Sequence, residues 1–270
     1  MAVQSGVFAA LMAQKGYSGT ERVFEGKEGF MDTFIGWNAK DESMKPTKME
    51  GRDGISSWAW DIEALVDGLG EHYKIMECGM KAFPTEALTH THLSCLLNAM
   101  IGNNLDYTDI QEVKVTCFAQ AYDILFDPTK YRPESRETAD HSLPYCLAAA
   151  MVDKKITTES FSDEKLSDPR IFEVIDKIKG EPSQEFEKMF PEKQPSKVVV
   201  TTNNGKQFEE YLEYPKGDPR EPMTMDDLEN KFNSLAGDKF NLDAKAKIKE
   251  TIFNCEDMTA SKFMESLNVQ

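Results

Sequence analysis

The sequence predicts an α+β protein in which helical segments at both ends flank a segment of mixed helix and strand. Near the two ends, apolar residues recur at helical spacing. In the middle, residues 111–119 alternate between apolar and polar, which is typical of a strand, and the runs 198–202 and 207–214 flank a turn rich in Asn and Gly, which is typical of a hairpin. Shifts in composition near residues 76 and 215 predict three parts, 1–76, 77–215 and 216–270.

The composition excludes several classes of protein. Hydrophobic residues make up 40% of the 270 residues, which fits a globular protein with a core. The formal charge of −16 argues against nucleic acid or an anionic membrane as the main partner. No apolar run is long enough to span a bilayer and no basic leader is visible, so we expect a cytoplasmic protein. The five cysteines form no CxxC pair and are expected to be reduced thiols.

The first part of the chain begins on a helix. Val3, Val7 and Leu11 share one helical face, and Gly16 ends the pattern. The glycine-bearing stretch 24–30 lacks the spacing of a phosphate-binding loop. Residues 35–60 are expected to be irregular, and 61–73 a short helix.

The middle part mixes the two periods. Residues 85–101 predict an amphipathic helix, and 142–152, apolar on nearly all sides, predict a buried one. Residues 111–119 predict a strand. Residues 198–214 predict a hairpin whose turn is rich in Asn and Gly, at Asn203-Asn204-Gly205-Lys206.

The last part returns to helices. Thr224 to Asp227 resembles a capping box, and the apolar stripe that follows ends before Gly237. Two more helices are predicted at 242–253 and 258–267.

A first group of chemically useful residues lies at the start of the helix 85–101. Glu86 and His90 are four residues apart and share a face, just after the segment Lys81-Ala82-Phe83-Pro84. A lysine beside a helix N-terminus, with a histidine one turn in, could hold a carboxylate. In the alternative, Glu86 complements the helix dipole and His90 packs at a surface.

A second group precedes the helix 142–152. Ser142 is a natural N-cap, and His141 beside Asp140 is either a substrate contact or a side chain that bonds to the backbone. His92 and Cys95 have metal-ligand spacing but lack two further ligands, so no metal site is expected. No GxSxG elbow of a serine hydrolase is present.

These motifs resemble the MmgE/PrpD family, which includes 2-methylcitrate dehydratases and cis-aconitate decarboxylases. The likeness rests on the segment 81–84 followed by His90, and on the segment 137–145 around His141. Flanking segments at 2–11, 23–26 and 217–232 agree in order, so the resemblance covers nearly the whole chain.

The resemblance implies a metal-free lyase without a cofactor. It also implies a homodimer in which an α+β lid, here 77–215, closes over an all-helical domain. This chain holds only part of that domain, in 1–76 and in the C-terminal helices 216–270. The substrate would be a tricarboxylate bound between domain and lid.

The resemblance also implies roles for single residues. Lys81 and His90 would be catalytic on the lid face, Lys81 as a cation and His90 as acid or base. Tyr122, expected at the end of the strand 111–119, would be a catalytic tyrosine that faces the substrate. Glu86, His141 and Ser142 would contact the substrate.

Glu86 bears on the reaction. It stands where dehydratase-like members tend to carry glutamate and decarboxylase-like members histidine, which favours dehydration of 2-methylcitrate over the alternative, decarboxylation of cis-aconitate. Met1 aligns deep within the family's helical domain. We therefore expect one part of a split enzyme with a separate N-terminal subunit, a truncated reading frame, or a non-catalytic remnant that acts in binding or assembly.

Overall fold

The computed structural model describes residues 1–24, 29–30 and 66–268, which fall into two compact units, 1–73 and 74–270. The two units are described separately. The irregular segment predicted at 35–60 and the first five residues of the helix predicted at 61–73 lie outside the described residues.

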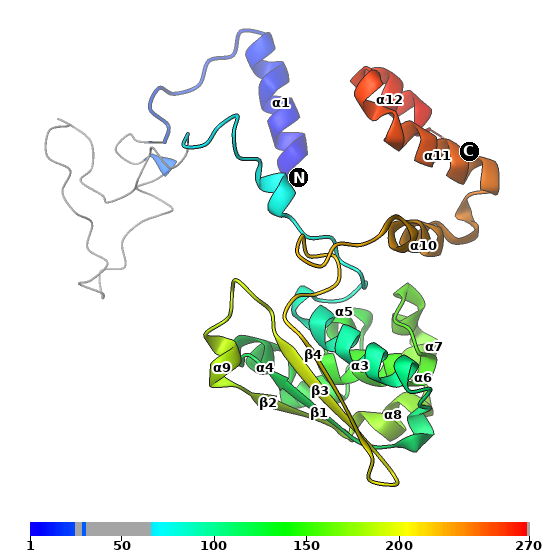
Figure 1. Ribbon diagram of the computed structural model, residues 1–270. Helices are drawn as coiled ribbons and strands as arrows, with labels where there is room; N and C mark the ends of the chain where they lie inside the picture. The colour runs from blue at the N-terminus through cyan, green and yellow to red at the C-terminus, as the bar shows by residue number, and fades with distance from the viewer. Residues whose placement is uncertain (25–28, 31–65, 269–270) are drawn as a thin grey trace, which may run out of the picture. The chain divides into compact units, whose positions relative to one another are not determined.

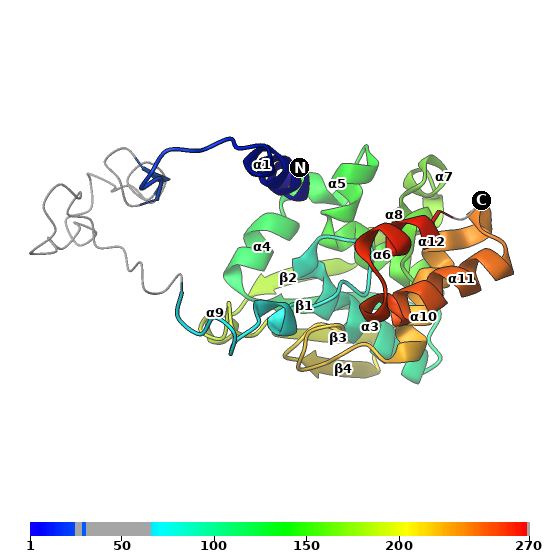
Figure 2. The same ribbon diagram turned by 90° about the horizontal axis from the view of Figure 1, so that it is seen from above.

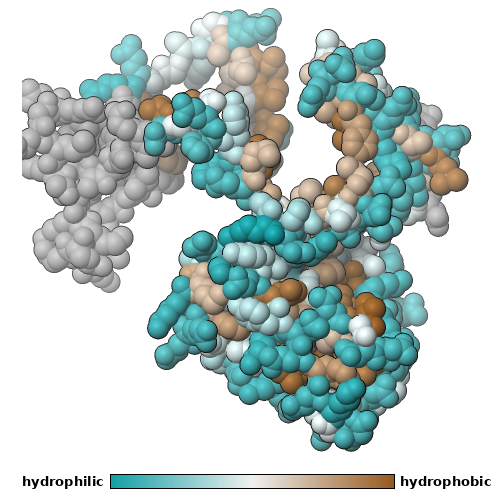
Figure 3. Space-filling view, viewed as in Figure 1, coloured by the Kyte–Doolittle hydropathy of each residue, from teal (hydrophilic) through white to brown (hydrophobic). Residues whose placement is uncertain are grey.

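In the first unit, α1 (Ala2–Gln14) forms as predicted and ends before Gly16, whose φ of 89° suits glycine. None of its residues is buried, and its apolar side chains form a hydrophobic stripe in Figure 3. Residues 66–71 form turns rather than the predicted helix, and residues 72–73 belong to no regular element. Gly68 and Gly70 both have positive φ there, which a helix does not allow.

The second unit is built on a four-stranded sheet with the order β2-β1-β3-β4 (Figure 1). Its strands are β1 (Ile110–Cys117), β2 (Ile178–Pro182), β3 (Ser196–Thr202) and β4 (Gln207–Leu212). β1 pairs with β2 in parallel and with β3 antiparallel, and β3 pairs with β4 antiparallel. The predicted hairpin is thus confirmed, and Gly205 in its turn has a φ of 80°.

β1 confirms the predicted alternation, because Val113, Val115 and Cys117 are all fully buried. The predicted end of this strand is wrong. Pairing stops at Cys117, opposite Pro182, and the chain continues into α4 (Ala119–Leu125). Tyr122 therefore lies within a helix and does not end a strand.

Helices cover one face of the sheet (Figures 1 and 2). α3 (His90–Gly102) packs on β3 and β4, and α6 (Leu143–Asp153) packs on α3 and on α8 (Pro169–Ile175). Every residue from 143 to 151 is buried, which confirms the helix predicted as apolar on nearly all sides. The helix predicted at 85–101 begins later, at His90, after the 3₁₀ turn η4 (Ala87–Thr89).

Short elements complete this part of the unit. They are η3 (Lys74–Glu77), η5 (Tyr107–Asp109), η6 (Pro128–Tyr131), α5 (Arg136–Asp140), η7 (Thr158–Phe161), α7 (Asp163–Leu166) and α9 (Gln184–Glu187).

The three predicted C-terminal helices are present as α10 (Met225–Ala236), α11 (Leu242–Phe253) and α12 (Ala260–Ser266), with the 3₁₀ turns η8 (Gly237–Lys239) and η9 (Cys255–Asp257) between them. The predicted capping box is confirmed: Thr224 Oγ accepts from Asp227 N, and the Asp227 carboxylate accepts from Thr224 N at 2.8 Å. Among the described residues, no helix is long and apolar enough to cross a membrane.

The segments before α3 and before α10 are tied together. Met80 N donates a hydrogen bond of 2.8 Å to Gly217 O. Gly217 has a φ of 95°, and a Cβ atom there would lie 1.9 Å from Met80 O. Only glycine allows this close approach. The segment that leads to α3 and the segment that follows β4 therefore lie side by side at this bond.

Candidate functional site

A backbone hydrogen bond joins the two motifs that the sequence singled out. Glu86 N, at the start of η4, donates to Asp140 O, at the end of α5, over 2.9 Å. The turn that carries Lys81, Glu86 and His90 therefore lies against the segment 140–142.

Lys81 and His90 both hydrogen-bond the turn between them. Lys81 Nζ donates to Thr85 O at 2.8 Å, and the Thr85 backbone also hydrogen-bonds His90. The His90 ring is 2% exposed and lies edge-on to Phe83, with ring centroids 5.4 Å apart. The alternative in which His90 packs at a surface is therefore wrong, because His90 packs in the interior.

Burial changes the acid–base behaviour of His90. Desolvation lowers its pKa to about 4; the bond to the Thr85 backbone opposes the change, and the charges of Lys81 and Lys231 add to it. The imidazole is therefore neutral at pH 7. As a proton acceptor at neutral pH it is weak, and its catalytic role stays a prediction.

Glu86 and Ser142 both cap local structure. Glu86 is the N-cap of η4, and its carboxylate accepts a hydrogen bond of 2.6 Å from Leu88 N. Ser142 is fully buried; its hydroxyl accepts from Tyr145 N at 3.1 Å and donates to Lys130 O at 2.5 Å. The predicted N-cap is confirmed. Both hydrogen-bonding roles of this hydroxyl are occupied, so the structure accounts for Ser142 without a substrate, and the predicted contacts of both residues stay predictions.

Asp140 and His141 form the accessible acid–base pair of this region. His141 Nδ1 lies 2.5 Å from Asp140 Oδ1 and 3.1 Å from Glu137 O, and the His141 side chain is 49% exposed. Two acceptors around Nδ1 indicate that this nitrogen carries a proton. Nε2 is then the nitrogen that is left to accept or deliver a proton.

Tyr122 is not joined to this group. It is half-buried in α4 and stacks on Phe126 with ring centroids 5.7 Å apart. Within the described part of the chain, no hydrogen bond connects it to Lys81, His90 or His141. Its catalytic role stays a prediction.

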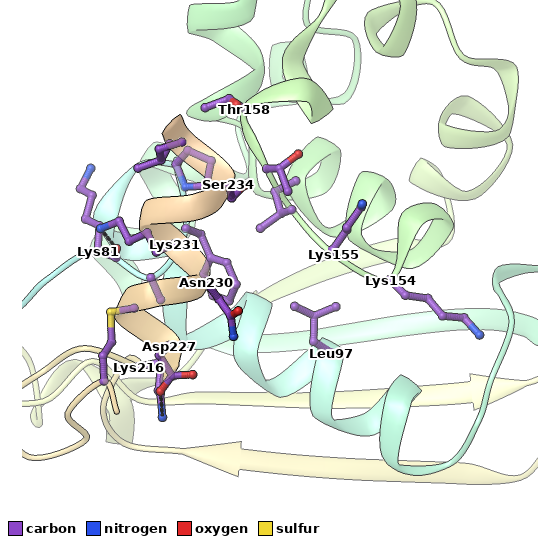
Figure 4. Close-up of a pocket in the computed structure, with 17 residues that line it drawn as sticks. Lys81, Leu97, Lys154, Lys155, Thr158, Lys216, Asp227, Asn230, Lys231 and Ser234 are labelled. Atoms are coloured by element: carbon purple, nitrogen blue, oxygen red, sulfur yellow. Dashed lines mark hydrogen bonds and ion pairs between the residues drawn. The ribbon is translucent and has the colours of Figure 1, made fainter. Parts of the chain in front are cut away.

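A cavity of about 580 Å³ opens beside Lys81, between α10, α3 and the loop that follows α6 (Figure 4). Apolar side chains make up much of its wall: Phe83, Pro84, Leu97, Ile156, Met223 and Leu235. Five lysines also line it, against a single carboxylate, that of Asp227: Lys81, Lys154, Lys155, Lys216 and Lys231. In a chain of net charge −16, this is a local excess of positive charge.

Within the residues that the structure describes, four of these lysines form no ion pair with a carboxylate, and the side chains of three of them, Lys81, Lys155 and Lys231, stay beside α10 and its neighbours. Lys216 forms an ion pair with Asp227 at 3.0 Å, and the Lys154 side chain extends away from α10 in Figure 4. Lys231 Nζ instead donates to a carbonyl, Lys81 O, at 2.6 Å. Lys81, Lys155 and Lys231 thus keep their positive charge free within the residues that the structure describes. The sequence pointed to Lys81 alone, and missed the lysines that other segments bring to it.

The arrangement suits an anionic molecule better than a metal ion. No group of three or more His, Cys, Asp or Glu residues that could hold a metal occurs among residues 1–24, 29–30 and 66–268. Lysine ammonium groups bind carboxylates and phosphates. The region thus combines a proton-transfer pair, Asp140 and His141, with Lys81 on the neighbouring turn, and Lys155 and Lys231 join Lys81 around the adjacent cavity.

The chain is similar to several curated cis-aconitate decarboxylases. The chain is 23% identical to the cis-aconitate decarboxylase of Aspergillus terreus over 99% of its own length and 53% of that protein. It is 22% identical to the human cis-aconitate decarboxylase over 98% of its length and 51% of that protein. A cis-aconitate decarboxylase-like protein, oryM, of Aspergillus oryzae is 23% identical over 94% of the chain and 50% of its own length. The chain thus spans about half the length of the curated relatives it matches.

The family comparison is more specific. The family model for the MmgE/PrpD C-terminal domain matches residues 83–257, which include the sheet, α3, α6, His90, the Asp140–His141 pair and α10. The protein belongs to the MmgE/PrpD family.

Proposed function

We propose that the protein is a lyase that acts on a small polycarboxylate, with His141 as the residue that moves the proton. The observation that carries the proposal is the hydrogen bond from Glu86 N to Asp140 O, since it places the Lys81 turn beside the Asp140–His141 pair. The names of three relatives, all cis-aconitate decarboxylases or similar to them, support a lyase.

The residue types fit the chemistry. When a carboxylate leaves as carbon dioxide, the electron pair of the broken bond moves toward the neighbouring unsaturated acid, and a proton must then be added to carbon. His141 supplies this proton through Nε2, while Asp140 holds the ring in place through Nδ1. Lys81 contributes positive potential where negative charge develops.

Decarboxylation is the reaction we favour. Glu86 favoured dehydration only through its resemblance to dehydratase-like members, and the structure accounts for this glutamate as a cap of η4. The relatives reported above are named for decarboxylation. Dehydration of 2-methylcitrate is the second candidate, in which the same pair would remove a proton and assist the departure of the hydroxyl group.

We also propose a protein partner or further chain for the exposed helices. Large apolar side chains are at least half exposed on α1 (Val3, Val7, Phe8, Leu11) and on the C-terminal helices (Leu242, Ile252, Phe253, Met264). Apolar stripes of this kind are typical of surfaces that bind protein. Light scattering on the purified chain, alone and with candidate helical partners, measures whether it assembles.

Turnover tests the enzymatic proposal. The purified protein is incubated with cis-aconitate and, separately, with 2-methylcitrate, and mass spectrometry distinguishes loss of carbon dioxide from loss of water. We expect His141→Asn to lower turnover by about 100-fold or more, and His72→Asn, an exposed histidine of the other unit, to leave it unchanged. Equal turnover by both variants would refute the role of His141. Two acids left unchanged by the chain, both alone and with its candidate helical partners, would refute the lyase.

A further inference from the structure

The cavity beside Lys81 has two chemically different parts. Its rim carries the ammonium groups of Lys81, Lys155 and Lys231, none of which is paired with a carboxylate in the described part of the chain. Its wall carries Phe83, Leu97, Ile156 and Leu235 among other apolar side chains.

The volume of the cavity exceeds what carboxylate groups alone would need. At about 580 Å³ it lies within the range of roughly 300–1,000 Å³ that is usual for binding sites of drug-sized molecules. Apolar walls of this kind stabilise a ligand by removing its hydrocarbon surface from water.

We infer that this cavity binds a polycarboxylate that carries an alkyl substituent, with the carboxylates at the lysine rim and the alkyl group against the apolar wall. The inference rests on the proposed lyase function in taking carboxylates as the anionic groups. It narrows the substrate class from tricarboxylates in general to acids with a hydrocarbon branch longer than one methyl group.

Lys231 recognises the carboxylates in this arrangement. It lies on α10, and its ammonium group is held by Lys81 O at 2.6 Å, so two lysines meet at one edge of the cavity (Figure 4). Lys155 lies on the other side of the α10 ribbon in the same view, on the loop after α6. Carboxylates at either edge of the cavity thus meet a cation without first having to break an ion pair.

Leu235 tests the apolar part. It lies one turn further along α10, lines the cavity and is 52% exposed, so its truncation removes wall without opening the core. Leu242, on α11 and 82% exposed, is outside the cavity and serves as its matched control. Lys247, an exposed lysine of α11, is the matched control for Lys231.

The experiment is calorimetric titration of the full chain with succinate, butylsuccinate and octylsuccinate. We expect the affinity to rise about fourfold for each methylene group that becomes buried. Lys231→Gln should weaken all three acids by a similar factor, about tenfold, because it removes one charge and keeps a donor for Lys81 O. Leu235→Ala should flatten the rise with chain length, while Lys247→Gln and Leu242→Ala leave both quantities unchanged.

The outcomes separate this inference from the proposed function. An affinity that is independent of chain length, no binding at all, or an equal loss in Lys231→Gln and Lys247→Gln would each overturn the inference. Turnover of cis-aconitate that depends on His141 would still support the lyase in those cases. Conversely, the expected binding pattern without turnover of any acid, by the chain alone or with its candidate helical partners, would support the cavity and refute the lyase.

Discussion

The unit 74–270 contains two buried histidines. We therefore predict that its free energy of unfolding begins to fall near pH 6.5 on acidification, before the carboxylates become protonated. His90 is 2% exposed and His92 is fully buried, with its Nδ1 2.5 Å from Ser196 Oγ. Burial lowers the pKa of His90 to about 4 and that of His92 to about 3. In the unfolded chain both return to about 6.5.

The sign follows from the direction of these shifts. Below pH 6.5 the unfolded chain takes up a proton at each histidine and the folded chain does not, so the free energy of unfolding falls as the pH falls toward the folded pKa values. At pH 5 each histidine lowers the free energy of unfolding by about 2 kcal/mol relative to its value well above pH 6.5. The two together lower it by about 4 kcal/mol, a large fraction of the stability of a typical domain.

Urea denaturation at pH 7.5 and pH 5 measures the difference. Circular dichroism is the suitable signal because it follows helices of the unit 74–270, whereas Trp37, Trp58 and Trp60 all lie outside the described residues. We expect His92→Gln to halve the dependence on pH and His72→Gln to leave it unchanged.

Nuclear magnetic resonance supplies a direct check. Ring-proton signals of two histidines should not titrate above pH 5. If those of all four titrate near pH 6.5, or if stability is equal at pH 7.5 and pH 5, the reasoning from burial is wrong.

Three further changes have defined outcomes. Ser142→Ala removes the cap of α6 and the hydrogen bond to Lys130 O, and should lower the free energy of unfolding, measured in urea, by about 2 kcal/mol. Ser135 is an exposed cap of α5, so Ser135→Ala should lower it by less than about 1 kcal/mol. Gly217→Ala should cost more than about 2 kcal/mol, because its φ is positive and the new Cβ meets a carbonyl; an unchanged urea midpoint would contradict this. Ellman's reagent should modify the exposed Cys78 and Cys255 at once, and react only on unfolding with the three buried thiols, whose pKa values burial raises: Cys95, Cys117 and Cys146.

Elements with a strong local pattern were predictable from the sequence. The hairpin β3–β4 follows from a run of β-branched residues, 198–202, that leads into an Asn-Gly turn, and α6 follows from a continuous apolar run after a capping serine. The sequence did not predict β2, because Gly180 and Pro182 interrupt its five residues and a parallel pairing with a strand 65 residues earlier leaves no local signal. Tyr122 was misplaced because the alternation of β1 runs into a segment where Ala121 and Leu125, one helical turn apart, are both buried.

The candidate site was predictable only where its residues are neighbours in the chain. The Asp140–His141 pair and Lys81 stand in short motifs that chemistry singles out. The exposure of His141 and the burial of His90 depend on packing around each ring, which spacing does not reveal. Lys155 and Lys231 join Lys81 only through the fold, because they come from a loop and a helix far apart in the sequence.

The hydrogen bond between Met80 N and Gly217 O determines how the unit 74–270 responds to a pulling force. Tension applied at residues 74 and 268 would run along the chain to Met80, cross to Gly217 and leave again, without passing through the sheet. The contact between the segments at Met80 and Gly217 bears the force, and no force acts on the strands until this contact breaks. In a pulling experiment the unit should therefore yield first where these two segments meet, by loss of the Met80–Gly217 bond of 2.8 Å and of the bond from Lys231 Nζ to Lys81 O, and only afterwards by separation of β1 from its neighbours.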